Sequence, residues 1–346
     1  MTAPLAAVSR APSAADRNGW IDCLRAVAAL VVALFHLNLL VAAPAESAVA
    51  GAWRDAFHFG YLGVPVFFVI SGYCIGATWL RCAGPADFAW RRGRRILPAY
   101  WASLALVAAL ALGFKLARGV NDVATLPSTP AAILATLALC TDPATSVKNM
   151  NWVNWSLVAE AAFYLVCGLL LLAPRLGPSR AWRLAGVHTL LCACALWPAL
   201  PKTGPIFFVH LWPMFGLGAV LPVWRVAPAA GVTMATISAL ALVAELVARG
   251  PGNGSLLAAA ITTVVLAAIL PRPMPTWLRP LAWFGGLSYS LYLVHVPLGL
   301  YGFLRFLPTA PVSVPVYFGV QLLWSLLVGV AAWFFWRCFE RPFLRA

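Results

Sequence analysis

Charged side chains are scarce in this sequence. Only 10% of its 346 residues are Asp, Glu, Lys or Arg, against 62% hydrophobic residues and a mean hydropathy of +0.87. A soluble chain of this length carries about 25% charged residues, which cover its surface. The shortage excludes an ordinary soluble domain and predicts an all-α bundle that crosses the membrane several times, because helices satisfy their own backbone hydrogen bonds in lipid.

Acidic residues are the scarcer of the two charged kinds. The 10 Asp and Glu face 24 Lys and Arg, which gives a formal net charge of +14. Such an excess can indicate nucleic-acid binding, but these basic residues lie between apolar runs, as they do in cytoplasmic loops of membrane proteins. We therefore expect a lipid bilayer, and no nucleic acid, as the partner of this surface.

Motifs for metals and disulfides are missing as well. The 8 cysteines lie mainly inside or beside apolar runs and show no C-x-x-C spacing. Buried free cysteines that behave as small hydrophobic residues are the simpler interpretation. We expect neither a zinc site nor a disulfide framework, and no bound cofactor.

A cleavable signal sequence is not evident either. Residues 1–18 are polar, basic and rich in Ala and Pro, without an apolar core before a cleavage site. We expect them to form a cytoplasmic tail, followed by a single membrane-embedded domain over residues 19–346.

Long apolar runs are what the sequence has in abundance. A spanning helix needs about 20 apolar residues, and this length predicts ten spans, at 20–42, 59–80, 97–117, 153–173, 183–200, 206–224, 230–248, 255–271, 282–304 and 313–337. The apolar piece 131–140 is too short to cross and is expected to be interfacial or re-entrant. We expect the chain to lie in the inner (plasma) membrane with both termini in the cytoplasm. This orientation places most arginines on the cytoplasmic side, as the positive-inside rule requires.

A few ionisable residues interrupt these runs, and inside a membrane such residues are candidates for function. Arg25 and His36 share the first span, and their separation places them on one face about 16 Å apart along the axis. Glu160, His295 and His210 come from three other spans at a depth similar to that of His36. A carboxylate beside an imidazole suits general-base chemistry, so we expect Glu160 to support His36.

Two further features are less specific. Ser71 and Gly72 lie in mid-span, where small residues let a neighbouring helix or a ligand approach closely. A group of four arginines precedes the third span and fits either membrane anchoring or the binding of an anion's phosphates: Arg91, Arg92, Arg94 and Arg95.

Taken in order, these segments resemble the membrane-bound acyltransferase 3 family, whose members O-acylate bacterial surface polysaccharides, lipids and some secondary metabolites. The segments that carry the resemblance are Arg25 to His36, GVPVFFVISGY, RRGRRILPAYW, NWSLVAEAAFY, GLSYSLYLVHVP and the closing ERPF.

The resemblance implies that an acyl group, expected to be acetyl, passes from cytoplasmic acyl-CoA to the hydroxyl of a cell-surface or lipid-linked glycan. It assigns His36 as the catalytic base, with Glu160 sharing proton transfer. Arg25 and the four-arginine group would hold the donor's phosphates. Ser71, Tyr289 and His295 would line the pocket.

Other functions remain open at this point. A flippase or transporter for a lipid-linked glycan would also have many spans and few buried charges. An acyltransferase acting on a macrolide, a lipid or an amino sugar would share the same motifs. Acceptor choice is expected to lie in the outer loops 43–58 and 118–152.

Overall fold

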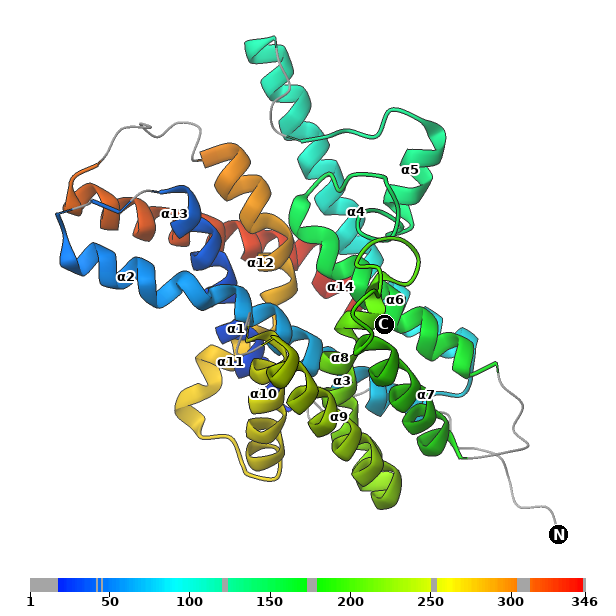
Figure 1. Cartoon of the computed structure of the whole chain (residues 1–346). Helices are drawn as coiled ribbons and strands as arrows, with labels where there is room; N and C mark the ends of the chain where they lie inside the picture. Colours follow the sequence, from blue (N-terminus) through cyan, green and yellow to red (C-terminus); the bar gives the residue numbers. More distant parts are fainter. Residues whose placement is uncertain are drawn as a thin grey trace.

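The computed structural model describes residues 18–41, 43–44, 46–119, 124–172, 179–249, 254–303 and 312–344. All regular structure within these ranges is helical, which confirms the predicted fold class (Figure 1). Of the predicted tail only Asn18 is described, and its side chain caps the first helix by accepting the N–H of Trp20.

The helices follow one another in a single bundle. The first half of the chain contains α1 (Gly19–Leu40), α2 (Ala48–His58), η2 (Phe59–Leu62), α3 (Gly63–Arg81), α4 (Pro85–Arg118), α5 (Pro130–Leu137), η3 (Trp152–Asn154) and α6 (Trp155–Leu170). The second half contains α7 (Arg180–Ala195), η4 (Phe207–Leu211), α8 (Trp212–Val226), α9 (Pro228–Arg249), α10 (Ser255–Ile269), η5 (Thr276–Leu278), α11 (Arg279–Gly285), α12 (Ser288–Val294), η6 (His295–Gly302), α13 (Val314–Phe335), η8 (Trp336–Glu340) and α14 (Arg341–Leu344).

Among the described residues, 7 helical stretches are long and apolar enough to cross a membrane. They coincide with seven of the ten predicted spans, so the polytopic membrane architecture is confirmed. In the remaining three ranges the helices are shorter, with 16 residues in α7 and 15 in α10, or interrupted, as at 282–304. The count of ten crossings therefore stays a prediction.

The predicted continuous span at 282–304 is instead three pieces, α11, α12 and the π-helical η6. The first break falls at Gly285, which packs against the backbone of α1. A methyl group at Gly285 would overlap the carbonyl oxygen of Asp22. The second transition, to π-helix, begins at His295, and insertions of this kind are frequent at functional sites.

The arginine group lies inside a helix rather than in a loop. Helix α4 begins at Pro85, twelve residues before the predicted start, and includes all four arginines. The short α5, predicted as a non-spanning piece, has eight residues and is fastened to α4. Tyr100 donates to the carbonyl of Thr136 at 2.7 Å, and the indole N–H of Trp101 donates to that of Leu137 at 3.0 Å.

Close glycine contacts hold α3 against α8, as Ser71-Gly72 in mid-span had suggested. A side chain at Gly72 would overlap the carbonyl oxygen of Phe215, and one at Gly218 would overlap that of Val69. Helix α1 is approached in the same way by Gly63, where a methyl group would meet the carbonyl of Ala28. Small residues at such crossings let backbones touch, which is how helices associate in lipid.

These contacts predict an asymmetric response to glycine substitution. Gly72→Ala should destabilise the folded protein by about 1–3 kcal/mol, because the added methyl group has no space between α3 and α8. Gly168→Ala in α6 is the matched control, since nothing lies within 4 Å of the added group. Thermal unfolding in detergent measures both, and equal stability of the two variants would contradict the packing described here.

Candidate functional site

Two cavities lie along α1. One, with a volume of about 420 Å³, is lined by His36 and is called the histidine pocket below. The other, of about 90 Å³, is lined by Arg25 and is called the arginine pocket. Val32, between these two residues in the chain, lines both pockets. Arg25, Val32 and His36 therefore follow one face of the helix, as the spacing predicted.

The η3–α6 segment also runs along both pockets, from the histidine pocket to the arginine pocket. Along α6 and the η3 turn before it, Trp152 lines the histidine pocket, Ser156 lines both and Glu160 lines the arginine pocket. The two pockets are thus adjacent chambers stacked along the bundle. The wall between them consists of the residues that line both: Val32, Val64, Phe68, Ser156 and Tyr292.

The imidazole of His36 is held by a second imidazole. Nδ1 of His36 lies 2.9 Å from Nε2 of His295, and the two rings stack with centroids 5.1 Å apart. Both side chains are buried, with 7% of His36 and 1% of His295 exposed. The sequence had placed these residues at one depth, and the structure brings them into direct contact across α1 and η6.

The backbone settles which nitrogens carry protons. Nδ1 of His295 lies 2.8 Å from the carbonyl oxygen of Tyr292, which can only accept, so His295 donates from Nδ1. In a neutral ring Nε2 of His295 is then an acceptor, and Nδ1 of His36 must donate to it. The lone pair of His36 is left on Nε2. That nitrogen makes no hydrogen bond within the described part of the chain, and its ring lines the pocket.

An indole fixes the other side of the His36 ring. Trp152 packs edge-on against His36 with centroids 4.7 Å apart. His295 lines neither pocket, and His36 therefore stands between the chamber and a buried partner. This arrangement presents one basic nitrogen, in one tautomer, to the larger cavity.

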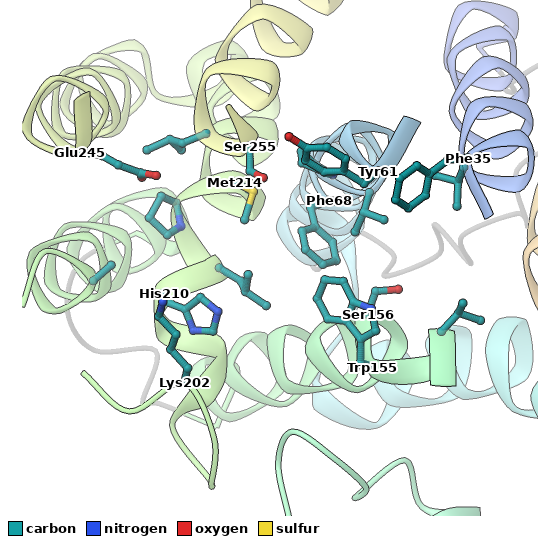
Figure 2. Close-up of a pocket in the computed structure, with 18 of the residues that line it drawn as sticks. Phe35, Tyr61, Phe68, Trp155, Ser156, Lys202, His210, Met214, Glu245 and Ser255 are labelled. Atoms are coloured by element: carbon teal, nitrogen blue, oxygen red, sulfur yellow. The ribbon is translucent and has the colours of Figure 1, made fainter. Parts of the chain in front are cut away.

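The histidine pocket has two unlike walls, which face each other in Figure 2. One wall is aromatic and comes from Phe35, Tyr61, Phe68 and Trp155. The opposite wall bears polar groups from other helices and from the connection between α7 and η4: Lys202, His210, Glu245 and Ser255. An aromatic face opposite hydrogen-bonding groups is suited to a ligand with both apolar and hydroxyl surfaces.

Two of the four grouped arginines reach the arginine pocket. Arg92 and Arg95, one turn apart on α4, line it together with Arg25. Arg92 donates to the hydroxyl of Thr78, and its Nε is buried without a partner among the described residues. Arg91 pairs with Asp87 at 2.7 Å, and neither it nor Arg94 lines either pocket. The four arginines therefore lie on different faces of α4, and only Arg92 and Arg95 face the pocket.

Arg25 is oriented by neighbours on both sides. One guanidinium nitrogen donates to Asp22 at 3.0 Å, and another lies 3.3 Å from the sulfur of Cys74. Among the residues that line this chamber, three guanidinium groups (Arg25, Arg92 and Arg95) stand against one carboxylate (Glu160), which leaves an excess of positive charge. Guanidinium groups gathered in this way favour phosphate.

Glu160 lies in the arginine pocket and makes its hydrogen bonds there. Its carboxylate accepts the hydroxyl of Ser71 and, at 2.5 Å, that of Tyr164. The expected contact with His36 is absent from the hydrogen bonds of the described residues, where His295 takes that place. Tyr289 lines the same chamber and donates to the carbonyl of Ile96 at 3.1 Å. Whether Glu160 shares in proton transfer stays a prediction.

Comparison with known proteins identifies the chain. The model of a family described as an acyltransferase domain, acyltransferase 3, matches residues 18–334. The chain belongs to this acyltransferase family. The matched residues contain both pockets, so the chambers are part of the family's domain. No solved structure matches the chain.

Several curated proteins are similar to this acyltransferase, two of the three below over most of its length. BcsY of Komagataeibacter xylinus, whose name describes a membrane-bound transacylase, is 29% identical over 304 residues, covering 82% of this chain and 73% of BcsY. The peptidoglycan O-acetyltransferase OatA of Listeria monocytogenes is 28% identical over 334 residues, covering 80% of this chain and 49% of OatA. The exopolysaccharide production protein ExoZ of Rhizobium meliloti is 34% identical over 156 residues, covering 42% of this chain and 44% of ExoZ.

Sequence reasoning missed several residues of this acyltransferase's pockets. Ser156 lies one helical turn from Glu160 and Tyr292 one turn from His295, which is the signal that could have found them, and Trp152 lies one turn further from Glu160. Lys202 and Glu245 carried no such signal. Among the described residues of the loops expected to choose the acceptor, Trp152 alone lines the histidine pocket, whose polar wall comes from other segments.

The contact between the two histidines predicts a specific loss in the acyltransferase. His295→Ala should lower turnover about 100-fold or more, because His36 loses the acceptor that fixes its tautomer. His295→Gln, which keeps an acceptor oxygen, should recover part of the activity. Turnover is measured as the rate of acyl transfer to an acceptor.

The matched control is His188→Ala. His188 is also fully buried and bonded, at 3.0 Å to Ser238, but it lines neither pocket. Its loss should lower stability and leave the turnover of the folded protein near that of the wild type. Equal turnover losses in the His188 and His295 variants would contradict a positioning role for His295.

Proposed function

We propose that this chain transfers an acyl group, specifically acetyl, from acyl-CoA to a hydroxyl group of a glycan. The acceptor is reached from the outer side of the inner membrane. The observation that carries the proposal is the position of His36. Its ring, whose lone pair is on Nε2, lines the larger chamber, and the wall of that chamber is shared with a pocket rich in arginine.

The two chambers have chemistry that suits the two substrates. Phosphate groups of coenzyme A would bind Arg25, Arg92 and Arg95, and the pantetheine arm would extend along α1. The distance of about 16 Å from Arg25 to His36 is within reach of such an arm. A sugar would enter the histidine pocket, where aromatic rings stack on its apolar face and Lys202 and Glu245 bind hydroxyl or charged groups.

The reaction balances without a cofactor. Nε2 of His36 accepts the proton of the acceptor hydroxyl as that oxygen bonds to the thioester carbonyl carbon. The tetrahedral intermediate collapses with cleavage of the carbon–sulfur bond, and the leaving thiolate takes the proton from His36. Products are the O-acyl ester and coenzyme A. The bond to His295 stabilises the imidazolium ion by keeping Nδ1–H paired.

The names of relatives support a glycan acceptor. OatA is named for O-acetylation of peptidoglycan and ExoZ for exopolysaccharide production. Membership of an acyltransferase family favours an enzyme over a flippase. The inner-membrane location, with both termini and the arginine pocket on the cytoplasmic side, is part of the proposal and rests on the positive-inside distribution of arginine.

His36→Ala should abolish acyl transfer, by about 1,000-fold or more, and leave donor binding intact. The measurements are thiol release from acetyl-CoA by protein in lipid nanodiscs, and binding of a non-hydrolysable acetyl-CoA analogue by calorimetry. Wild-type thiol release by this variant would exclude His36 as the base.

Two variants bracket this result. His58→Ala removes an exposed histidine of α2 and should behave as the wild type. Arg92→Ala should do the reverse of His36→Ala and weaken analogue binding about tenfold or more, since a charged hydrogen bond to phosphate is lost. A flippase would give no thiol release with any of these proteins.

A further inference from the structure

Hydroxyl groups are confined to one place in the wall between the chambers. Of the five residues that line both pockets, Val32, Val64 and Phe68 are apolar, and only Ser156 and Tyr292 carry a hydrogen-bond donor. Any group that passes from the arginine pocket toward His36 must cross this wall. Its polar atoms can therefore be bonded there by these two hydroxyls alone among the shared residues.

The two hydroxyls are bonded to each other and differ in freedom. The oxygens of Ser156 and Tyr292 lie 2.9 Å apart, and Tyr292 donates its single hydrogen to the carbonyl of Val153. Ser156 must then be the donor in the pair. The Ser156 hydrogen can turn to a new acceptor by rotation of the side chain, whereas the Tyr292 hydrogen is held by the backbone.

Each of the two residues lies one turn from a residue that contacts His36, Ser156 from Trp152 and Tyr292 from His295. Ser156 follows Trp152, which packs on His36, by four residues. Tyr292 precedes His295 by three residues and accepts the hydrogen bond of its ring. Residues three and four apart on a helix are about 5–6 Å apart. The hydroxyl pair lines the same pocket as His36 and also faces the arginine pocket.

We propose that Ser156 is the oxyanion donor of the transfer reaction, an inference that rests on the proposed function. As the acceptor oxygen bonds to the thioester carbon, the carbonyl electron pair moves to its oxygen, and the Ser156 O–H hydrogen-bonds the negative charge. The pair returns when the carbon–sulfur bond breaks, and Ser156 keeps its hydrogen throughout. In an otherwise apolar wall such a donor stabilises the transition state strongly.

The test compares Ser156→Ala with Ser156→Thr and Tyr292→Phe in nanodiscs, with kcat and KM for acetyl-CoA measured separately. Ser156→Ala should lower kcat about 100- to 1,000-fold with KM nearly unchanged, because only the transition state loses a bond. Ser156→Thr keeps a hydroxyl and should recover most of the rate. Tyr292→Phe keeps the Ser156 hydroxyl and should lose less than Ser156→Ala. If Ser156→Ala does not fold, the isosteric Ser156→Cys, a weak donor, carries the same expectation.

Three outcomes would overturn the inference. They are a wild-type kcat in the Ala or Cys variant, a loss confined to KM, and an acyl group covalently attached to Ser156 in the intact mass spectrum. The last would make this residue a nucleophile. If Ser156→Ala is fully active while His36→Ala is dead, this inference alone fails. If both are fully active, the proposed function fails as well.

Discussion

The hydrogen bond between His36 and His295 is the interaction on which the site depends. It is the middle of a chain that runs from the Tyr292 carbonyl through both rings to the open Nε2 of His36. Because a peptide carbonyl cannot donate, the chain has one direction, and it delivers a base to the histidine pocket. Tyr292 also contacts Ser156, so the same residue links the base to the hydroxyl pair in the wall.

This series of hydrogen bonds requires that helix α1 be held firmly in place, since α1 carries both Arg25 and His36. Glycines make that possible, because Gly63 and Gly285 bring neighbouring backbones against it. Helix α13 adds a hydrogen bond to α1, in which the Tyr317 hydroxyl donates to the side chain of Asn38 at 2.6 Å. In lipid, where apolar contact alone does not drive helices together, such close packing and hydrogen bonds set the position of Arg25 and His36.

The sequence was sufficient for the membrane architecture and for the residues on α1. Apolar length located seven of the ten predicted spans, and helical spacing placed Arg25 and His36 on one face, because both follow from local periodicity. Depth was also derivable, and it brought His36 and His295 together. The rotation of one helix relative to another could not be derived from the sequence. Glu160 has the expected depth but faces the other chamber, with Ser71 and Tyr164 as its partners.

The same limit explains the arginine group and the acceptor wall. Four arginines at one membrane face could not be divided from composition, yet only Arg92 and Arg95 line the pocket. Lys202 and Glu245 both line the histidine pocket because tertiary packing brings together segments that are far apart in the chain. Sequence patterns record periodicity along one helix, and a pocket built from five or more helices depends on how their faces turn.

In the proposed function, donor and acceptor enter stacked chambers from opposite sides and meet at His36. Sealed proteoliposomes of defined orientation test it most directly, with acetyl-CoA supplied only on the arginine-pocket side and a glycan acceptor trapped only on the other. The account predicts acetyl ester on the trapped acceptor, and none when acetyl-CoA is supplied on the acceptor's side alone. Transfer only when both substrates share one side would contradict it.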